Sequence, residues 1–282
     1  MSAALALSVL LSGAAQETPA PQAAPAIRWE KNFEEALKKA RRLDKPVIVD
    51  FWADWCDWCH RLERTTYADP AVAREAQDFV ALRVDTEGSL KEQAVAKRYR
   101  VSNLPTIAFL SPEGREVHRV NGFQGPGQFP FTLDAARQAA RWVAGWEEAL
   151  RRNPDDPRAL VALGTQSYER EYFDEARDLL RRAIPRDAEA APEDRRRARM
   201  LLAIIEHVTR NFEEAERLVR EALALPPDPD EQPKLLFVLG RTQVSSGRQA
   251  EGLATFEVIV REYPQSPVAQ KARETLTSLK KR

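Results

Sequence analysis

The chain is poor in the residues that build metal sites. Only two cysteines, three histidines and two methionines occur among its 282 residues. A structural zinc site takes about four Cys or His ligands. The histidines, His60, His118 and His207, are scattered along the sequence, so they and the cysteine pair do not predict a zinc site.

The chain also lacks an excess of charge of either sign. It has 43 Lys and Arg residues against 43 Asp and Glu residues, and the two signs are interleaved along the chain. Binding of nucleic acid needs a concentrated basic surface, so this balance argues against such a partner. Charge runs such as the one at 193–197 are interpreted as solvated helix faces.

Long hydrophobic runs are absent as well, and the one apolar segment lies at the N-terminus. Residues 3–11 are apolar but too few to span a bilayer, and small residues including Gly13 and Ala15 follow as in a cleavage site. We therefore predict a signal peptide at 1–15, although no Lys or Arg precedes its apolar run. A Pro/Ala-rich linker is predicted at 16–26. The expectation is an exported, periplasmic protein that is soluble and has no stable membrane insertion. Disulfide chemistry is possible in that compartment.

Both cysteines lie in one stretch, DFWADWCDWCH, at residues 50–60. A disulfide between Cys56 and Cys59 would close so short a loop that the chain-entropy model gives only about 2 kcal/mol of stabilisation. The pair is therefore a poor structural cross-link, but such a local bond opens and closes readily. The same residues fit the C-x-x-C-H pattern of c-type haem attachment, which is a minor alternative. Against it stand the β-rich VIVDFW before the pair and the scarcity of methionine as an axial ligand.

Residues 27–133 alternate between strand and helix patterns. Strand patterns lie at 45–52, 79–85 and 106–110, and a turn leads from the last of them to a hairpin partner at 115–120. Helical patterns begin after Asn32, which has the capping-box partner Glu35 three residues on, and recur at 60–67 and 91–99. This order predicts an α/β domain with a central mixed sheet flanked by helices.

Residues 134–282 predict an all-α domain built from repeats. Three units each carry a small residue in a first helix and another twelve positions later in a second helix. These pairs are Gly164 and Ala176, Ala203 and Ala215, and Gly240 and Gly252. The spacing resembles the tetratricopeptide repeat, a helical solenoid whose concave face binds a protein partner. A helix at 134–152 is expected before the units and another from Ser266 after them.

The cysteine stretch resembles the thioredoxin family over residues 45–123. The matching features are VDFWADWCDWC followed by NLPT at 103–106. Within that family WADWC, RLERTTYADPAV, NLPT and the Gly-Phe at 122–123 most resemble the C-terminal periplasmic domain of the disulfide reductase DsbD. The resemblance implies a thioredoxin-like fold and a thiol–disulfide oxidoreductase that reduces or exchanges disulfides of client proteins. It implies a thiol electron donor, and no cofactor beyond the redox-active Cys56–Cys59 pair.

The positions of three residues suggest their roles in that chemistry. Cys56 stands where a strand ends and a helix begins, so the helix dipole favours its thiolate and it is predicted to be the exposed nucleophile. Cys59, one turn on, is predicted to resolve the mixed disulfide. Asp50 lies within an apolar strand, which predicts a raised pKa. By resemblance it takes the proton from the resolving cysteine. The family often has a lysine where this chain has Ala81, so the charge compensation of Asp50 is left open.

Three further residues are expected to tune the pair. Asp57 places a negative charge beside the thiolate, which favours a reductant with a potential nearer that of thioredoxin than that of a periplasmic oxidant. Trp58 is interpreted as a hydrophobic cover on the cysteines, with contact to a partner as the alternative. His60 follows Cys56 by one turn and would support the thiolate if protonated, or is an exposed residue with no role.

The resemblance also implies a substrate groove. Pro105 is expected to be a cis-proline facing the cysteines, which leaves Leu104 able to pair with an extended substrate strand. Trp55, Thr106 and Gly122 are expected to flank that groove. An alternative function is a protein-binding scaffold in which the cysteine pair is regulatory or vestigial. In either case the rings of Phe129 and Phe131 are predicted to pack between the two domains, with contact to a substrate as the alternative.

Overall fold

The computed structural model describes residues 26–279, except for the side chains of residues 187 and 189. The predicted signal peptide at 1–15 and all but the last residue of the predicted linker at 16–26 lie outside the described residues. Among the described helices, none is both long enough and apolar enough to cross a membrane.

The N-terminal part of the chain forms the predicted mixed sheet. Five strands lie in the order β1-β3-β2-β4-β5. β1, β3 and β2 are parallel to one another, and β4 is antiparallel to both of its neighbours, β2 and β5. The strands are β1 (Trp29–Glu30), β2 (Val47–Trp52), β3 (Val80–Asp85), β4 (Thr106–Leu110) and β5 (Glu116–Asn121). The helices between them are α1 (Phe33–Leu43), α2 (Asp57–Arg64), α3 (Pro70–Glu75), the 3-10 turn η1 (Ala76–Asp78) and α4 (Leu90–Arg98). Two short elements, β1 and α3, had no counterpart in the sequence analysis.

Alternating residues of β2 serve the two faces of the sheet. Val47, Val49 and Phe51 pack in the core formed with α1 and α4. Ile48 packs in the other core, which includes residues from α2, α3 and the long helix α5 (Phe129–Arg152). Because side chains alternate along a strand, Asp50 points to the same face as Ile48. The sequence therefore places one carboxyl group on the α2 side of a buried strand.

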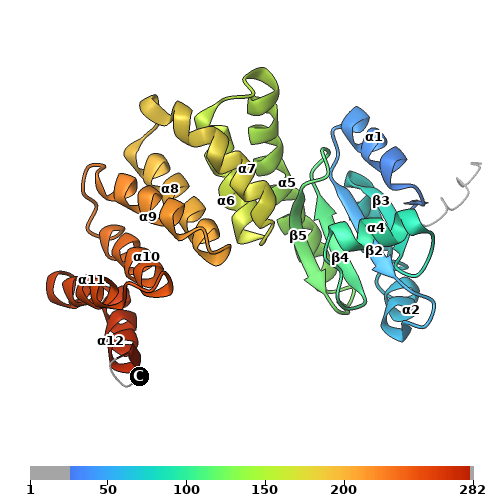
Figure 1. Ribbon diagram of the computed structural model, residues 1–282. Helices are drawn as coiled ribbons and strands as arrows, with labels where there is room; N and C mark the ends of the chain where they lie inside the picture. Colours follow the sequence, from blue (N-terminus) through green and yellow to red (C-terminus); the bar gives the residue numbers. More distant parts are fainter. Residues whose placement is uncertain (1–25, 280–282) are drawn as a thin grey trace, which may run out of the picture.

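The C-terminal part of the chain is entirely helical and forms the predicted solenoid (Figure 1). Its elements are α6 (Pro157–Glu169), α7 (Phe173–Ala183), the 3-10 segment η2 (Ile184–Glu189), α8 (Pro192–Val208), α9 (Phe212–Leu223), α10 (Gln232–Ser245), α11 (Gln249–Glu262) and α12 (Pro267–Leu279). The pairs α6/α7, α8/α9 and α10/α11 are the three predicted units.

The small residues of the repeats lie where paired helices approach each other closely. A Cβ atom added to Gly164 would lie 2.9 Å from the side chain of Leu180. At Gly240 the corresponding distance to the ring of Phe256 is 2.8 Å. Since these distances are shorter than ordinary carbon contacts, the absence of a side chain sets the separation of the helices.

Helix α5 connects the sheet to the solenoid and belongs to both. It begins at Phe129, before the expected start at 134, and so runs across the proposed domain boundary between 133 and 134. Phe129, Leu133 and Ala136 pack in the same continuous core as Ile48 of the sheet and Leu160 of α6. Phe131 was expected to pack between the domains, but it is 78% exposed because it lies on the opposite side of the helix from that core.

β5 lies next to α6 and α7 of the first repeat (Figure 1), and polar contacts join them beside α5. The buried carboxylate of Glu116 accepts hydrogen bonds from Arg119 at 2.6 Å and from the hydroxyl of Tyr172 at 2.7 Å. Its backbone carbonyl accepts a hydrogen bond from the Gln166 side chain at 2.6 Å. Partners from α6 and from the turn before α7 thus hold the sheet edge against the solenoid.

Candidate active site

The two cysteines stand at the N-terminus of α2, directly after β2. Cys56 is the N-cap residue of the helix, in an extended conformation, and Cys59 lies in its first turn. The two sulfur atoms form a disulfide with a Cα–Cα distance of 5.2 Å. The backbone N–H of Cys59 points at the Cys56 sulfur, 3.1 Å away. A thiolate at Cys56 would therefore receive one N–H group and the positive end of the helix dipole.

The exposure of the pair differs from the expectation. Cys56 was predicted to be exposed, yet only 4% of its surface is accessible, and Cys59 is fully buried. The order of the two is as predicted, since Cys56 is the more accessible residue. The difference arises because the strand end and the first turn of α2 enclose the disulfide, which a linear pattern does not reveal.

Asp50 is fully buried on the α2 side of the sheet. Cys59 and Leu62 form the buried side of α2, and Leu62 shares a core with Ile48, so this side of α2 faces the surface to which Asp50 points. The hydroxyl of Tyr67 donates a hydrogen bond to Asp50 Oδ1 at 3.1 Å. Burial raises the pKa of Asp50 to about 6, although the Arg83 charge and the Tyr67 hydrogen bond oppose this rise.

Arg83 supplies the charge compensation that the sequence analysis left open at Ala81. Arg83 lies opposite Asp50 in the β2/β3 register, and its Nε is 3.2 Å from Asp50 Oδ2. The guanidinium also bonds to Glu63 at 3.0 Å and lies over the ring of Trp52 at 4.5 Å. The sequence contained a signal for this pairing. Arg83 is the one cation in the strand pattern FVALRVD, and because it follows Ala81 by two residues its side chain points to the same face of the sheet.

The proline loop lies beside the start of β4. The Leu104–Pro105 peptide bond is cis, the isomer that the resemblance implies. The Pro105 carbonyl accepts a hydrogen bond from the Gly122 N–H at 2.8 Å, and Gly122 has φ +92°, which favours glycine. Leu104 precedes the first residue of β4 and is therefore outside the sheet ladder.

Thr106 does not line the groove with its side chain as expected. It is fully buried, and its hydroxyl donates to the Asn103 carbonyl at 2.7 Å. The same hydroxyl lies 3.2 Å from Asn121 Oδ1. Thr106 therefore holds the loop at 103–105 to β5, because its position as the first residue of β4 turns its side chain inward.

The residues around the disulfide include two exposed tryptophans. Trp55 is 66% exposed, and its indole N–H donates to Glu87 at 2.8 Å. Trp58 is 52% exposed and packs against Phe123, with ring centroids 5.5 Å apart. This exposure favours the alternative of partner contact for Trp58 over the predicted hydrophobic cover. Asp57 is exposed in the first turn of α2, and its effect on the redox potential stays a prediction.

The ring of His60 is engaged away from the cysteines. Its Nε2 lies 2.7 Å from the carbonyl oxygen of Asp54. Because a carbonyl only accepts, Nε2 must be the protonated nitrogen that donates. The ring also meets Trp52 edge to face, with centroids 6.3 Å apart. These contacts hold the ring at the turn before α2, so the predicted support for the thiolate lacks a direct contact.

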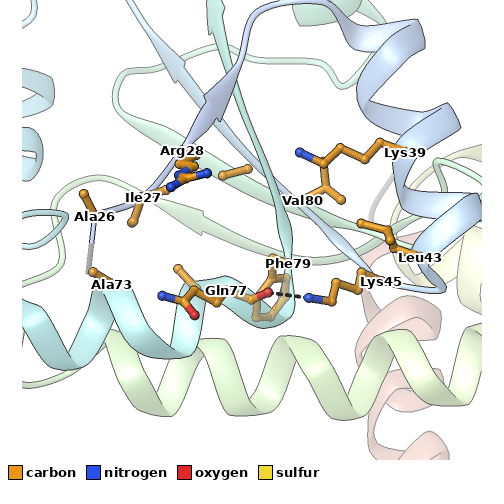
Figure 2. Close-up of a pocket in the computed structure, with 12 residues that line it drawn as sticks. Ala26, Ile27, Arg28, Lys39, Leu43, Lys45, Ala73, Gln77, Phe79 and Val80 are labelled. Carbon is orange, nitrogen blue, oxygen red and sulfur yellow. Dashed lines mark hydrogen bonds between the residues drawn. The ribbon is translucent and has the colours of Figure 1, made fainter. Parts of the chain in front are cut away.

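A cavity of about 610 Å³ lies at the other end of the sheet (Figure 2). Its lining includes Val80 and Ala81 at the start of β3, whereas the disulfide follows the end of the parallel strand β2. Lys45 donates to the Gln77 carbonyl at 2.7 Å across its floor (Figure 2). The cavity contains none of the predicted site residues. In the part of the chain that the structure describes, no cluster of three or more His, Cys, Asp and Glu could hold a metal ion.

Comparison with known proteins identifies both parts of the chain. The family model described as a thioredoxin-like domain matches residues 33–137. The tetratricopeptide repeat model matches residues 133–194, 173–231 and 208–267. The chain joins a thioredoxin-like domain to tetratricopeptide repeats. The two family models overlap within α5, the helix that both parts share.

The curated relatives are similar to the thioredoxin-like domain. The thiol:disulfide interchange protein DsbD of Vibrio vulnificus is 33% identical over 106 residues, which cover 36% of this chain and 18% of that protein. The DsbD of Salmonella typhimurium is 35% identical over 116 residues, covering 40% of this chain and 20% of that protein. The chain thus spans about a fifth of the length of these relatives. The solution structure of a thioredoxin from Thermus thermophilus is 31% identical in sequence and has a TM-score of 0.36. The match covers 39% of this chain and 85% of that chain.

Proposed function

We propose that this protein is a thiol–disulfide oxidoreductase that reduces the disulfides of client proteins. The observation that carries the proposal is the Cys56–Cys59 disulfide at the N-terminus of α2, with Cys56 as its N-cap. A local disulfide at a helix N-terminus is readily reduced, because the thiolate that forms receives a backbone N–H and the helix dipole. The pair itself is the redox group, and no other cofactor is needed.

The reaction proceeds by two exchange steps. The Cys56 thiolate attacks one sulfur of a client disulfide, so that the other client sulfur leaves as a thiolate and a mixed disulfide forms. The Cys59 thiolate then attacks the Cys56 sulfur, the second client thiolate leaves, and the Cys56–Cys59 bond closes. Two electrons pass to the client, and each released thiolate takes up a proton. A thiol electron donor returns two electrons to the pair for the next cycle.

Asp50 is proposed to receive the proton of Cys59. A carboxyl with a pKa of about 6 is mostly ionised at pH 7, yet it binds a proton more tightly than an ordinary carboxylate. Asp50 and Cys59 both lie between β2 and α2, shielded from solvent. Ionising Cys59 during the second step is the part of the cycle that such a base accelerates.

The solenoid is proposed to hold a protein partner. Its helix pairs stack beyond the sheet, and α5 and Glu116 fix the first pair to it (Figure 1). A partner bound to the repeats would keep a constant orientation toward the thioredoxin-like domain. Export to the periplasm is proposed on the N-terminal sequence alone.

Insulin reduction driven by dithiothreitol tests the enzyme. We expect the wild type to accelerate insulin precipitation and Cys56→Ser to have no activity, because the attacking sulfur is lost. Cys59→Ser is expected to accumulate mixed disulfides with clients, which gel electrophoresis without reductant detects. Inactivity of the wild type under these conditions would contradict the proposal.

A scaffold in which the pair is regulatory is a second candidate. The burial of both cysteines favours it, since a sulfur with little exposure reacts slowly with a bulky client. Under this proposal the wild type and Cys56→Ser are equally inactive toward insulin. Both would bind the same partner through the repeats, as pull-down with the purified full chain would measure.

A further inference from the structure

Arg61 lies on the exposed surface beside the disulfide, stacked on two aromatic rings. Its guanidinium carbon is 5.1 Å from the ring centroid of Trp58 and 5.0 Å from that of Phe123. Trp58 stands between the two cysteines in the sequence, and Phe123 follows Gly122, which bonds to the Pro105 carbonyl. The three side chains thus link the cysteine turn to the proline loop, and we call them the Arg61 stack.

The guanidinium of Arg61 has no acidic partner within residues 26–279, and the two rings are its only described contacts. By contrast, Arg83 on β3 forms ion pairs with both Asp50 and Glu63. A guanidinium that lies over an aromatic ring contacts it with a face, which leaves the N–H groups at its edge available. A fork of N–H groups in that plane matches a carboxylate.

The stack is not needed to hold the segment that carries Phe123 in place. Gly122 N–H donates to the Pro105 carbonyl at 2.8 Å, and the Thr66 hydroxyl donates to the Gln124 carbonyl at 2.6 Å. These bonds fix the segment on both sides of Phe123. The aromatic contacts therefore orient Arg61 more than they stabilise the loop.

We propose that the Arg61 stack selects client segments that carry an Asp or Glu side chain next to the reactive disulfide. This inference rests on the proposed function and adds a substrate class to it. The rings contact the apolar part of the client, and Arg61 pairs with its carboxylate. Asp54 and Asp57 are exposed on the N-terminal side of Arg61, and Asp57 is one helical turn before it in α2. They repel an acidic side chain placed toward the start of α2, so the selection depends on its position.

The test uses the full-length reduced protein and synthetic peptides closed by one disulfide, with Glu, Gln or Lys beside a cysteine. Single-turnover rates are followed by mass spectrometry and divided by the rate with 2,2′-dithiodipyridine, a neutral disulfide. We expect the Glu peptide to react about fivefold faster than the Gln peptide, as expected for a partly exposed charge pair, and the Lys peptide more slowly than either. High salt should reduce the difference.

Arg61→Gln is expected to bring the ratio of the Glu and Gln peptides close to one. Arg64→Gln is the matched control, because it removes the same charge from the next turn of α2 and should keep the wild-type ratio. Phe123→Ala should lower the preference by releasing Arg61 from the stack. Equal rates for the Glu and Gln peptides in the wild type, or an unchanged ratio in Arg61→Gln, would overturn the inference. If the wild type reacts with neither the peptides nor the dipyridyl disulfide, the proposed function itself fails.

Discussion

Asp50 is a carboxyl group whose protonation the fold controls from several sides. Burial raises its pKa to about 6, and the hydrogen bond from Tyr67 and the charge of Arg83 keep the pKa from rising further. Arg83 in turn contacts Glu63, which is half exposed, so the chain Asp50–Arg83–Glu63 leads from the core to the surface. Removing any of these groups should therefore shift the pKa of Asp50 in a predictable direction.

Asp50→Asn is expected to change how stability depends on pH. The folded pKa of Asp50, about 6, lies above its ordinary value of 3.8, so between these values the folded state binds more protons than the unfolded state. The free energy of unfolding therefore falls as the pH rises from 4 to 7, by about 2 kcal/mol from this group. Asn lacks this contribution, so urea unfolding of the oxidised variant should lose less stability over that range.

Asp54→Asn serves as the control, since it removes an exposed carboxylate two residues after the end of β2, the strand that carries Asp50. It should keep the pH dependence of the wild type. An Asp50→Asn variant with the same loss of stability as the wild type between pH 4 and pH 7 would contradict a raised pKa at Asp50.

Arg83→Met is expected to raise the pKa of Asp50 above about 6. The substitution removes the cation that favours the ionised carboxylate and leaves an apolar side chain in the same place. Titration of the Asp50 carboxyl carbon by NMR in the oxidised protein measures the midpoint directly. Arg83→Lys keeps a charge and should shift the midpoint less; equal midpoints in the wild type and Arg83→Met would refute the role of this ion pair.

At the scale of the elements, the small residues of the repeats fix how closely two helices pack. The pair Gly240 and Gly252 brings α10 and α11 together at the third unit. A Cβ atom at Gly252 would lie 2.5 Å from Val244 Cγ2 and 2.8 Å from the Gly240 carbonyl oxygen. The backbone oxygen cannot move aside without displacing α10, so a larger residue must push the two helices apart.

Gly252→Ala is therefore expected to destabilise the protein by about 1–3 kcal/mol, the usual cost of overpacking. Gly145→Ala in α5 is the matched control, because a Cβ atom there meets nothing within 4 Å and alanine favours a helix by about 1 kcal/mol. Urea unfolding followed by circular dichroism compares the two. Equal stability of Gly252→Ala and the wild type would show that the contact is relaxed at no cost.

For the whole molecule, α5 decides where an independent thioredoxin-like domain can end. Ala136, Ala140 and Val143 are buried in the core shared with the sheet, although all three lie beyond residue 133. The boundary expected at 133 therefore cuts through a helix that covers the sheet. The sequence suggested the boundary because strand patterns stop there, whereas the packing continues.

A fragment of residues 26–153 is expected to unfold cooperatively, and one of residues 26–133 is expected not to. The shorter fragment exposes the apolar residues of the sheet that α5 covers. The free energy of burial that it loses exceeds the net stability of a small domain. Thermal unfolding followed by circular dichroism distinguishes them. Identical cooperative transitions in both fragments would show that the second half of α5 is dispensable.

The sequence by itself determined the main elements and their order, apart from the short β1 and α3. The strand patterns at 45–52 and 79–85 predicted β2 and β3, and the paired small residues predicted the solenoid; both predictions are confirmed. Local patterns suffice here because the periodicity of side chains and the spacing of repeats are properties of neighbouring residues. The CxxC at a strand end likewise located the disulfide.

Only the tertiary structure decided which side chains meet around that disulfide. Arg83 pairs with Asp50 across two strands, and Arg61 stacks on Phe123 from a distant loop. The same folding encloses Cys56, turns Thr106 inward and extends α5 across the expected boundary. These contacts join residues far apart in the chain, and their geometry depends on how strands register and helices pack, which no local pattern specifies.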